Sequence, residues 1–242
     1  MDSMHRRAFP LLSGHSYDTM MDGNPSPPTP LAQRLAKTRQ RSPDLGPFFD
    51  EIVIALREAG VGSAAPKVGE MFPDFSLPTA DGRYRRLGDL LDLGPVIVNF
   101  SRGRWCPYCV HEVSIWAEML PELAKAGVRF VEITGETGGG ARALGALLAA
   151  SSHPEVAEVL CDVDHGVALS LGLAFFAGDP LLDFYGKAGV DMHELYGSPS
   201  GFLPVPATFA LDSSGCVRFA YADADFRERA EPAEVLAALR AG

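Results

Sequence analysis

The sequence predicts an α/β fold in which a central mixed sheet is flanked by helices and preceded by an N-terminal helical extension. Three continuous apolar runs, at 95–101, 128–134 and 156–161, are typical of buried strands, and segments with helical periodicity separate them. Strands and helices that alternate in this way form parallel sheets with right-handed crossovers. Two further strands, 207–211 and 217–221, surround a Ser-Ser-Gly turn and would form a hairpin, ahead of a last helix at 232–240.

Composition divides the chain into three parts. Residues 1–28 end in a stretch rich in Pro, Gly, Asn and Ser, which resists packing and is expected to be a flexible arm. Residues 29–66 carry two predicted helices, 31–41 and 47–59, and form the extension. Residues 67–242 form the α/β domain, which opens with a hairpin between 67 and 86.

The segments between the predicted strands also have recognisable patterns. Helices are expected at 107–127, 141–150 and 164–171, and Pro121 would kink or break the first of them. Residues 175–203 interrupt the alternation and are rich in aromatic side chains. Because long insertions in compact domains often line functional sites, we expect either a lid over the site or a dimer contact.

Charge and cysteine content exclude several classes of protein. A net charge of −10 and a pI near 5.0 argue against nucleic acid or an anionic membrane surface as a partner, since both require a cationic face. No run of about 18 apolar residues predicts a membrane span, and the Arg6-Arg7 pair is not followed by the apolar stretch of an export signal. Four cysteines are too few for a disulfide scaffold, so a reducing, cytoplasmic location is expected.

A Cys-x-x-Cys pair follows the first central strand. Cys106 would lie at the start of a helix, where unpaired N–H groups and the positive end of the helix dipole favour a thiolate. Pro107 suits the first helical position, and Cys109 would lie one turn further on, close enough to form a disulfide. Trp105 and Tyr108 flank the pair, and Trp105 is expected to shield the thiolate. This context predicts a redox site.

A zinc site is the main structural alternative for such a pair. Zinc usually takes four ligands, often from two Cys-x-x-Cys pairs, but Cys161 and Cys216 are isolated. His111 lies two residues beyond Cys109 and lacks the spacing of a zinc finger. We therefore expect no metal and no cofactor.

Four motifs carry a family resemblance. They are Val68-Gly69 with Pro73-Asp74-Phe75, Arg102-Gly103 before Trp105–Cys109, Cys161-Asp162-Val163-Asp164, and Val205-Pro206-Ala207-Thr208-Phe209-Ala210-Leu211-Asp212. Together they resemble the peroxiredoxin-like branch of the alkyl hydroperoxide reductase/thiol-specific antioxidant (AhpC/TSA) family. The resemblance implies a thioredoxin-like fold, reduction of hydroperoxides through Cys106, and a cis-proline at Pro206, preceded by Val205, that faces the cysteines.

The chain departs from that family's pattern at two positions. Gly103 stands where the family has a Thr or Ser, and Pro206 stands roughly where it has an Arg, so two donors to the peroxide are missing. Arg102, Arg104 or Ser101 could substitute for them. Measurable but slow peroxide turnover is therefore expected, because each preorganised donor contributes about 2.7–4 kcal/mol.

Three functions are compatible with the sequence. In the first, Cys106 reduces a hydroperoxide and Cys109 resolves the sulfenic acid as a disulfide, which a thioredoxin- or glutathione-type reductant then reduces. In the second, the same pair exchanges with a disulfide substrate and has little peroxidase activity. The third is a redox-silent binding domain. A homodimer is possible in each case.

Overall fold

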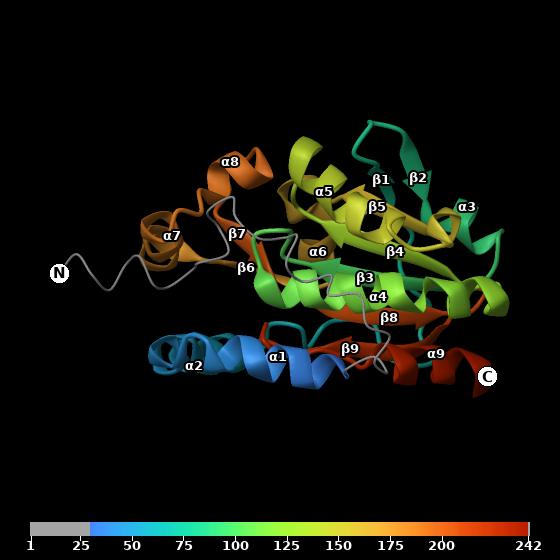
Figure 1. Cartoon of the computed structure of the whole chain (residues 1–242). Coiled ribbons are helices and arrows are strands. Elements are labelled where there is room, and N and C mark those ends of the chain that lie inside the picture. Colours follow the sequence, from blue (N-terminus) through green and yellow to red (C-terminus); the bar gives the residue numbers. More distant parts are fainter. Residues whose placement is uncertain (1–29, 242) are drawn as a thin grey trace.

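The computed structural model describes residues 30–241, so the predicted arm at 1–28 lies outside the described residues. Its main sheet has five strands in the order β5-β4-β3-β8-β9 (Figure 1). The strands are β3 (Val96–Ser101), β4 (Arg129–Thr134), β5 (Ala157–Cys161), β8 (Ala207–Leu211) and β9 (Val217–Ala222). β3, β4 and β5 are parallel, whereas β8 and β9 are antiparallel to their neighbours. The predicted mixed sheet is confirmed.

Helices cover both faces of this sheet, because its central strands are apolar on both sides. One face packs on α4 (Pro107–Ala126), α5 (Gly138–Ala149) and α9 (Pro232–Ala241). The other packs on α3 (Leu87–Leu91), α6 (Gly166–Ser170) and the hairpin of β1 (Ser76–Pro78) and β2 (Tyr84–Arg86). Short 3-10 turns, η4 (Pro154–Val156) and η5 (Val163–His165), flank β5.

Two helices precede the hairpin, as the sequence predicts. They are α1 (Leu31–Gln40) and α2 (Gly46–Glu58), joined through the 3-10 turn η3 (Pro43–Leu45). α1 lies along α4, where Leu31 and Leu35 pack on Ile115 (Figure 1). α2 brings Phe49 against Phe226, which follows β9. The extension therefore lies beside the first turns of α4, which carry the cysteine pair.

The segment 175–203 forms a small unit at one end of the sheet (Figure 1). It consists of β6 (Ala174–Phe176), α7 (Gly178–Lys187), α8 (Met192–Tyr196) and β7 (Phe202–Pro204), and β6 pairs with β7. Its buried aromatic residues Tyr185 and Tyr196 join the same apolar cluster as Trp105, Cys106 and Cys109. The unit therefore lies against the cysteine site, and a dimer contact through it stays a prediction.

Two predictions about prolines are corrected by the structure. The bond between Val205 and Pro206 is trans, since the described residues contain no cis peptide bond. The trans form is the default for such bonds, and it suits the extended path from β7 through Val205, whose N–H donates to the Leu173 carbonyl, into β8. Pro121 does not break α4 either, because the buried side chains on both sides of it, Trp116 and Leu123 among them, hold the helix on the sheet.

Candidate active site

The cysteine pair lies where the first turn of α4 meets the carboxyl end of β3. Cys106 is the N-cap residue of α4 and Pro107 occupies the first helical position, as the sequence predicts. Both sulfurs are free and buried, with Cys106 1% and Cys109 0% exposed. Helix geometry thus places the two thiols one turn apart on the side of α4 that faces the protein interior.

Gly103, the first departure from the family pattern, has a structural cause. Its φ is +111°, and a Cβ there would lie 2.6 Å from the Glu136 side-chain carboxyl carbon. Glu136 is buried in the loop after β4, and its carboxylate accepts a hydrogen bond from the backbone N–H of Arg104 at 3.0 Å. A Thr or Ser at this position would have to displace the buried Glu136 carboxylate and adopt a backbone conformation that is strained for any residue with a side chain.

Arg102 supplies a guanidinium on the pocket side of Cys106. It is 2% exposed, and its guanidinium carbon lies 4.5 Å from the Trp105 ring centroid and 4.2 Å from that of Phe226. One terminal nitrogen donates to the Tyr185 hydroxyl at 2.5 Å, while Nε has no protein partner. No described carboxylate pairs with it. Arg102 therefore keeps its charge, and its buried Nε is a donor without a protein partner.

Tyr196, from α8, holds the loop before Cys106 in place. Its hydroxyl donates to the Arg102 carbonyl at 2.8 Å and accepts from Trp105 Nε1 at 3.1 Å. Both contacts are buried, so their geometry is protected from water. The 175–203 unit thereby orients the two residues that immediately surround the Cys106 sulfur.

Cys109 faces a second arginine, on the sheet side. Arg229 Nη2 donates to the Cys109 sulfur at 3.3 Å, and Arg229 Nε donates to Glu112 at 2.6 Å. The Arg229 and Glu112 side chains are each 1% exposed. A further hydrogen bond from Arg229 to the Phe226 carbonyl fixes the guanidinium. Arg229 is thus neutralised by a carboxylate, unlike Arg102.

These surroundings give the two thiols different acidities. Burial opposes a charge on the Cys106 sulfur, whereas a hydrogen bond from the Cys109 thiol favours it. Attraction to Arg102 and Arg229 adds to the second effect, and the pKa of Cys106 is lowered to about 6. Burial, with the hydrogen bond and charge of Cys106, raises the pKa of Cys109 well above its ordinary value. At neutral pH the reduced site holds a Cys106 thiolate and a Cys109 thiol.

A buried polar network continues from this site under α4. Thr208 donates to Asn99 at 2.7 Å, and Asn99 donates to Glu132 at 2.8 Å. These residues are neighbours on β8, β3 and β4, because Asn99 pairs with both of the others across the sheet. Burial, together with the nearby Glu112 carboxylate, raises the pKa of Glu132 to about 8. Glu132 is therefore largely protonated at neutral pH.

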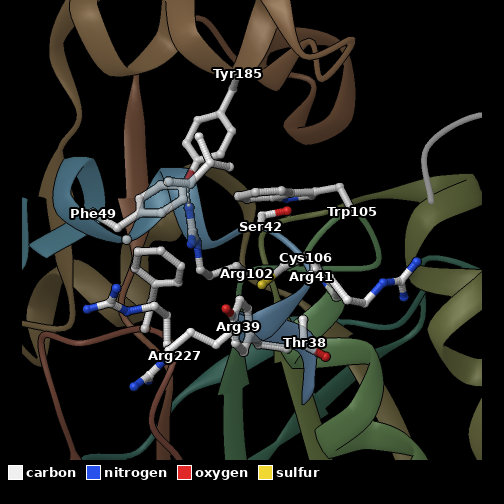
Figure 2. Close-up of a pocket in the computed structure, with 15 residues that line it drawn as sticks. Thr38, Arg39, Arg41, Ser42, Phe49, Arg102, Trp105, Cys106, Tyr185 and Arg227 are labelled. Atoms are coloured by element: carbon white, nitrogen blue, oxygen red, sulfur yellow. Dashed lines mark hydrogen bonds between the residues drawn. The ribbon is translucent and has the colours of Figure 1, made fainter. Parts of the chain in front are cut away.

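A pocket opens onto Cys106 between the N-terminal helices and the loop before α4 (Figure 2). Together with the open solvent at its mouth, the pocket has a volume of about 730 Å³. Its lining residues are Thr38, Arg39, Arg41, Ser42, Leu45, Gly46, Phe49, Arg102, Trp105, Cys106, Pro107, Tyr108, Tyr185, Phe226 and Arg227. The extension, the cysteine loop and the 175–203 unit each form one wall.

The structure separates the residues that the sequence suggested for the site. Cys106, Trp105, Pro107, Tyr108 and Arg102 line the pocket and Cys109 lies behind it. Arg104 is exposed, and Val205 and Pro206 are buried; none of these three lines the pocket. Among the described residues, no group of three His, Cys, Asp or Glu side chains is placed to hold a metal.

Several site residues carry no signal in the sequence. Tertiary contacts alone bring Arg229 to Cys109, Phe226 to Arg102 and Glu136 to the backbone of Arg104. Charged residues of such loops are ordinarily solvated. Glu112, near the start of α4, is likewise buried, and it pairs with Arg229. The spacing of Glu112 three residues after Cys109, on the same side of the helix, was the one available clue.

Among the described residues, no helix combines the length and apolar character needed to cross a membrane.

Fold and site together define a thiol-dependent oxidoreductase with a thioredoxin-like fold. The sequence profile of the AhpC/TSA family matches residues 68–220. The chain belongs to the AhpC/TSA family.

Solved structures of similar fold include several proteins of this kind. The peroxidoxin BcpB of Mycobacterium tuberculosis is 22% identical, with a TM-score of 0.53 over 72% of this chain and 97% of that protein. Reduced Prx3 of Vibrio vulnificus, in complex with hydrogen peroxide, is 17% identical, with a TM-score of 0.54 over 72% and 99%. A putative thioredoxin reductase of Burkholderia cenocepacia is 18% identical, with a TM-score of 0.54 over 72% and 97%. No curated protein sequence matches this chain.

Proposed function

We propose that this protein reduces hydroperoxides through Cys106 and that Cys109 resolves the oxidised cysteine. The observation that carries the proposal is the buried Arg102, which lines the same pocket as Cys106 and whose charge has no carboxylate partner and attracts the Cys106 thiolate. A guanidinium in this position attracts the thiolate and can donate to a peroxide oxygen. This position supports the proposal that Arg102 takes the role of the arginine that the family has roughly where Pro206 stands in this chain.

The first step oxidises Cys106. Its thiolate attacks the terminal oxygen of R–O–O–H, the O–O bond breaks, and the new S–O bond leaves a sulfenic acid. The peroxide gains two electrons and departs as an alkoxide, which takes a proton from water to become an alcohol. The Arg102 guanidinium would donate to the oxygen that gains charge, which lowers the barrier in a site sheltered from water.

The second step forms the disulfide. Loss of the Cys106 charge removes two of the causes that raise the pKa of Cys109, while Arg229 at 3.3 Å remains to attract a Cys109 thiolate. The Cys109 sulfur attacks the sulfenic sulfur, and its proton leaves with the hydroxyl group as water. An external dithiol or glutathione-type thiol then supplies two electrons and restores both cysteines.

Access to Cys106 favours a small oxidant over a protein disulfide. Cys106 is 1% exposed, and the neighbouring Trp105 is 5% exposed. We expect a small hydroperoxide to enter through the pocket, whereas the bulk around a protein disulfide would need the extension or the 175–203 unit to move. This favours the peroxidase function over the thiol–disulfide oxidoreductase that is the alternative.

Peroxide consumption with a dithiol reductant tests the proposal. We expect turnover by the wild-type protein and none by Cys106→Ser, because no nucleophile remains. Cys109→Ser should oxidise once and then stall or overoxidise at Cys106, which the mass of the intact protein would report. If the wild-type protein reduces a small disulfide rapidly and leaves hydrogen peroxide untouched, the alternative function replaces this one.

A further inference from the structure

The two helices of the N-terminal extension are attached to the domain by different forces. α2 is anchored by three buried apolar side chains, those of Phe49, Val53 and Leu56, and Leu56 belongs to the main core. α1 buries the side chains of Leu31 and Leu35 alone. A helix of 10 residues is not stable by itself in water, so α1 depends on its other contacts with the domain.

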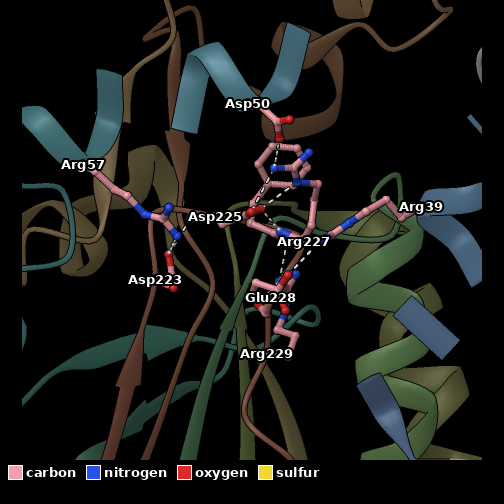
Figure 3. Close-up of polar contacts among 9 residues, drawn as sticks. Arg39, Asp50, Arg57, Asp223, Asp225, Arg227, Glu228 and Arg229 are labelled. Atoms are coloured by element: carbon pink, nitrogen blue, oxygen red, sulfur yellow. Dashed lines mark hydrogen bonds and ion pairs between the residues drawn. The ribbon is translucent and has the colours of Figure 1, made fainter. Parts of the chain in front are cut away.

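Those other contacts of α1 are ionic. The Glu231 carboxylate accepts from the backbone N–H groups of the first two residues of α1, at 3.1 and 2.7 Å, where the helix dipole is positive. Glu118, on α4, pairs with Arg34 at 2.8 Å, and Glu228 pairs with Arg39 at 2.6 Å (Figure 3). The side chains of these two pairs are between 24% and 48% exposed. Dissolved salt therefore weakens the attachment of α1.

α1 also forms part of the wall of the pocket over Cys106. Thr38 and Arg39, in its last turn, line that pocket (Figure 2), and Cys106 is 1% exposed while this wall is in place. The wall formed by the 175–203 unit is held more firmly, because buried hydrogen bonds join it to the side chain and carbonyl of Arg102. Of the elements around the cysteine, α1 has the attachment that is most easily released.

We infer that α1 is a gate over Cys106, which excludes reagents larger than a peroxide while its ion pairs hold it and admits them when it detaches from α4. The anchored α2 stays in place, and the turn η3 between the two helices is the hinge. The gate goes beyond the proposed function, since it governs access of any large thiol reagent to Cys106. Its use by the reductant of the Cys106–Cys109 disulfide rests on the proposed function.

Alkylation of Cys106 by two uncharged maleimides of different size tests the gate. One is N-ethylmaleimide and the other carries a long polyethylene glycol chain. The protein is the reduced full-length chain with Cys161→Ser and Cys216→Ser, in which Cys109 stays a protonated thiol at pH 7. The readout is the rate of the large reagent divided by that of the small one, so that a change in the thiolate fraction of Cys106 cancels.

The open form of the gate should be a minor state. We therefore expect this ratio to be at least about tenfold lower for the protein than for a short cysteine peptide. In about 0.5 M NaCl the ratio should rise several-fold, because charges are then screened over about 4 Å. The reagents are uncharged, so salt acts on the protein and not on their approach.

Three substitutions assign the gate to α1. Glu231→Ala, which removes the carboxylate at the start of α1, should raise the ratio about fivefold, the effect of losing one capping group. Arg34→Gln should raise it about twofold, since it breaks one exposed ion pair. Glu122→Gln is the matched control, because it breaks exposed pairs with Lys125 and Arg240 away from α1 and should leave the ratio unchanged.

Several outcomes would overturn the inference. One is a large reagent that reacts with the wild-type protein as rapidly as with the peptide, or with none of these proteins at all. Another is a ratio that neither Glu231→Ala nor Arg34→Gln changes; if Glu231→Ala does not fold, Arg34→Gln alone decides. Gated labelling of Cys106 in a protein that consumes no hydroperoxide would instead overturn the proposed function and leave the gate standing.

Discussion

Two buried arginines flank the cysteine pair, and they differ in what neutralises them. Arg229, on the sheet side, donates to Glu112 at 2.6 Å, so Cys109 faces a neutral pair. Arg102, on the pocket side, has a tyrosine hydroxyl and no carboxylate as its partner. The hydrogen bond from Cys109 to Cys106 is the main reason that these two buried thiols differ in acidity, and the unpaired Arg102 beside Cys106 and the Glu112 carboxylate near Cys109 add to the difference.

The two arginines therefore have different roles: the Arg229–Glu112 pair is structural, whereas Arg102 acts on the reacting cysteine. A buried carboxylate and guanidinium that neutralise one another hold the fold together and change little during turnover. A buried guanidinium without a carboxylate is costly to bury, and here the Cys106 thiolate balances its charge. The site is therefore held in a state that favours reaction with an electrophilic oxygen.

Breaking the neutral pair should have the largest effect on stability. Arg229→Gln leaves Glu112 buried and unpaired, so we expect a loss of about 3–5 kcal/mol in the free energy of unfolding. The double variant Arg229→Gln with Glu112→Gln should recover most of that loss, because no lone charge remains. Urea denaturation of the three proteins measures this. Equal stability of the single variant and the wild type would mean that Glu112 is already neutral.

Removing the unpaired guanidinium should affect chemistry more than stability. Arg102→Gln is expected to slow the oxidation of Cys106 by about 10²–10³-fold, the range seen when one preorganised donor is lost. Arg104→Gln is the matched control, since Arg104 is exposed and outside the pocket. Stopped-flow oxidation of the reduced proteins reports both rates. Similar rates for the two variants would show that Arg102 does not contact the peroxide.

A smaller effect should come from Glu132. Its pKa of about 8 lies above its ordinary value, so the folded state binds a proton that the unfolded state releases. Below about pH 4.5 Glu132 is protonated in the folded and the unfolded state, and the folded protein has its full stability. As the pH rises from there through 8, the unfolded state gains from losing this proton first, and the stability falls. Glu132→Gln should therefore gain stability relative to wild type as pH increases from 5 to 9, as denaturation at several pH values would show. If the stabilities of the two proteins depended on pH in the same way, the pKa of Glu132 would not be raised in the folded state.

The sequence predicts the parts of this account that depend on local patterns. The apolar runs predict strands, and the structure confirms them as β3, β4 and β5. The Cys106-Pro107 sequence predicts the start of a helix, and α4 begins there. Arg102 was one of three candidate donors, because it is adjacent to the motif. Its burial could not be predicted, since the covering residues Tyr185 and Phe226 lie far along the chain.

Other features depend on packing between distant segments. Arg229 reaches Cys109 across 120 positions of sequence, and no periodicity marks such a contact. Gly103 looked like the loss of a hydroxyl, whereas the structure shows that Glu136 occupies the space. The predicted cis bond at Pro206 came from resemblance alone, and the geometry of this chain differs.

The most direct test is the rate at which hydrogen peroxide oxidises Cys106, compared with a free cysteine at equal thiolate concentration. Alkylation against pH fixes the thiolate fraction and should give a midpoint near pH 6, below which the thiol is protonated and the rate falls. Stopped-flow fluorescence of Trp105 then gives the oxidation rate. We predict that Cys106 reacts at least about 10²-fold faster than the free thiolate, because Arg102 adds a preorganised donor. Equal rates would contradict the account.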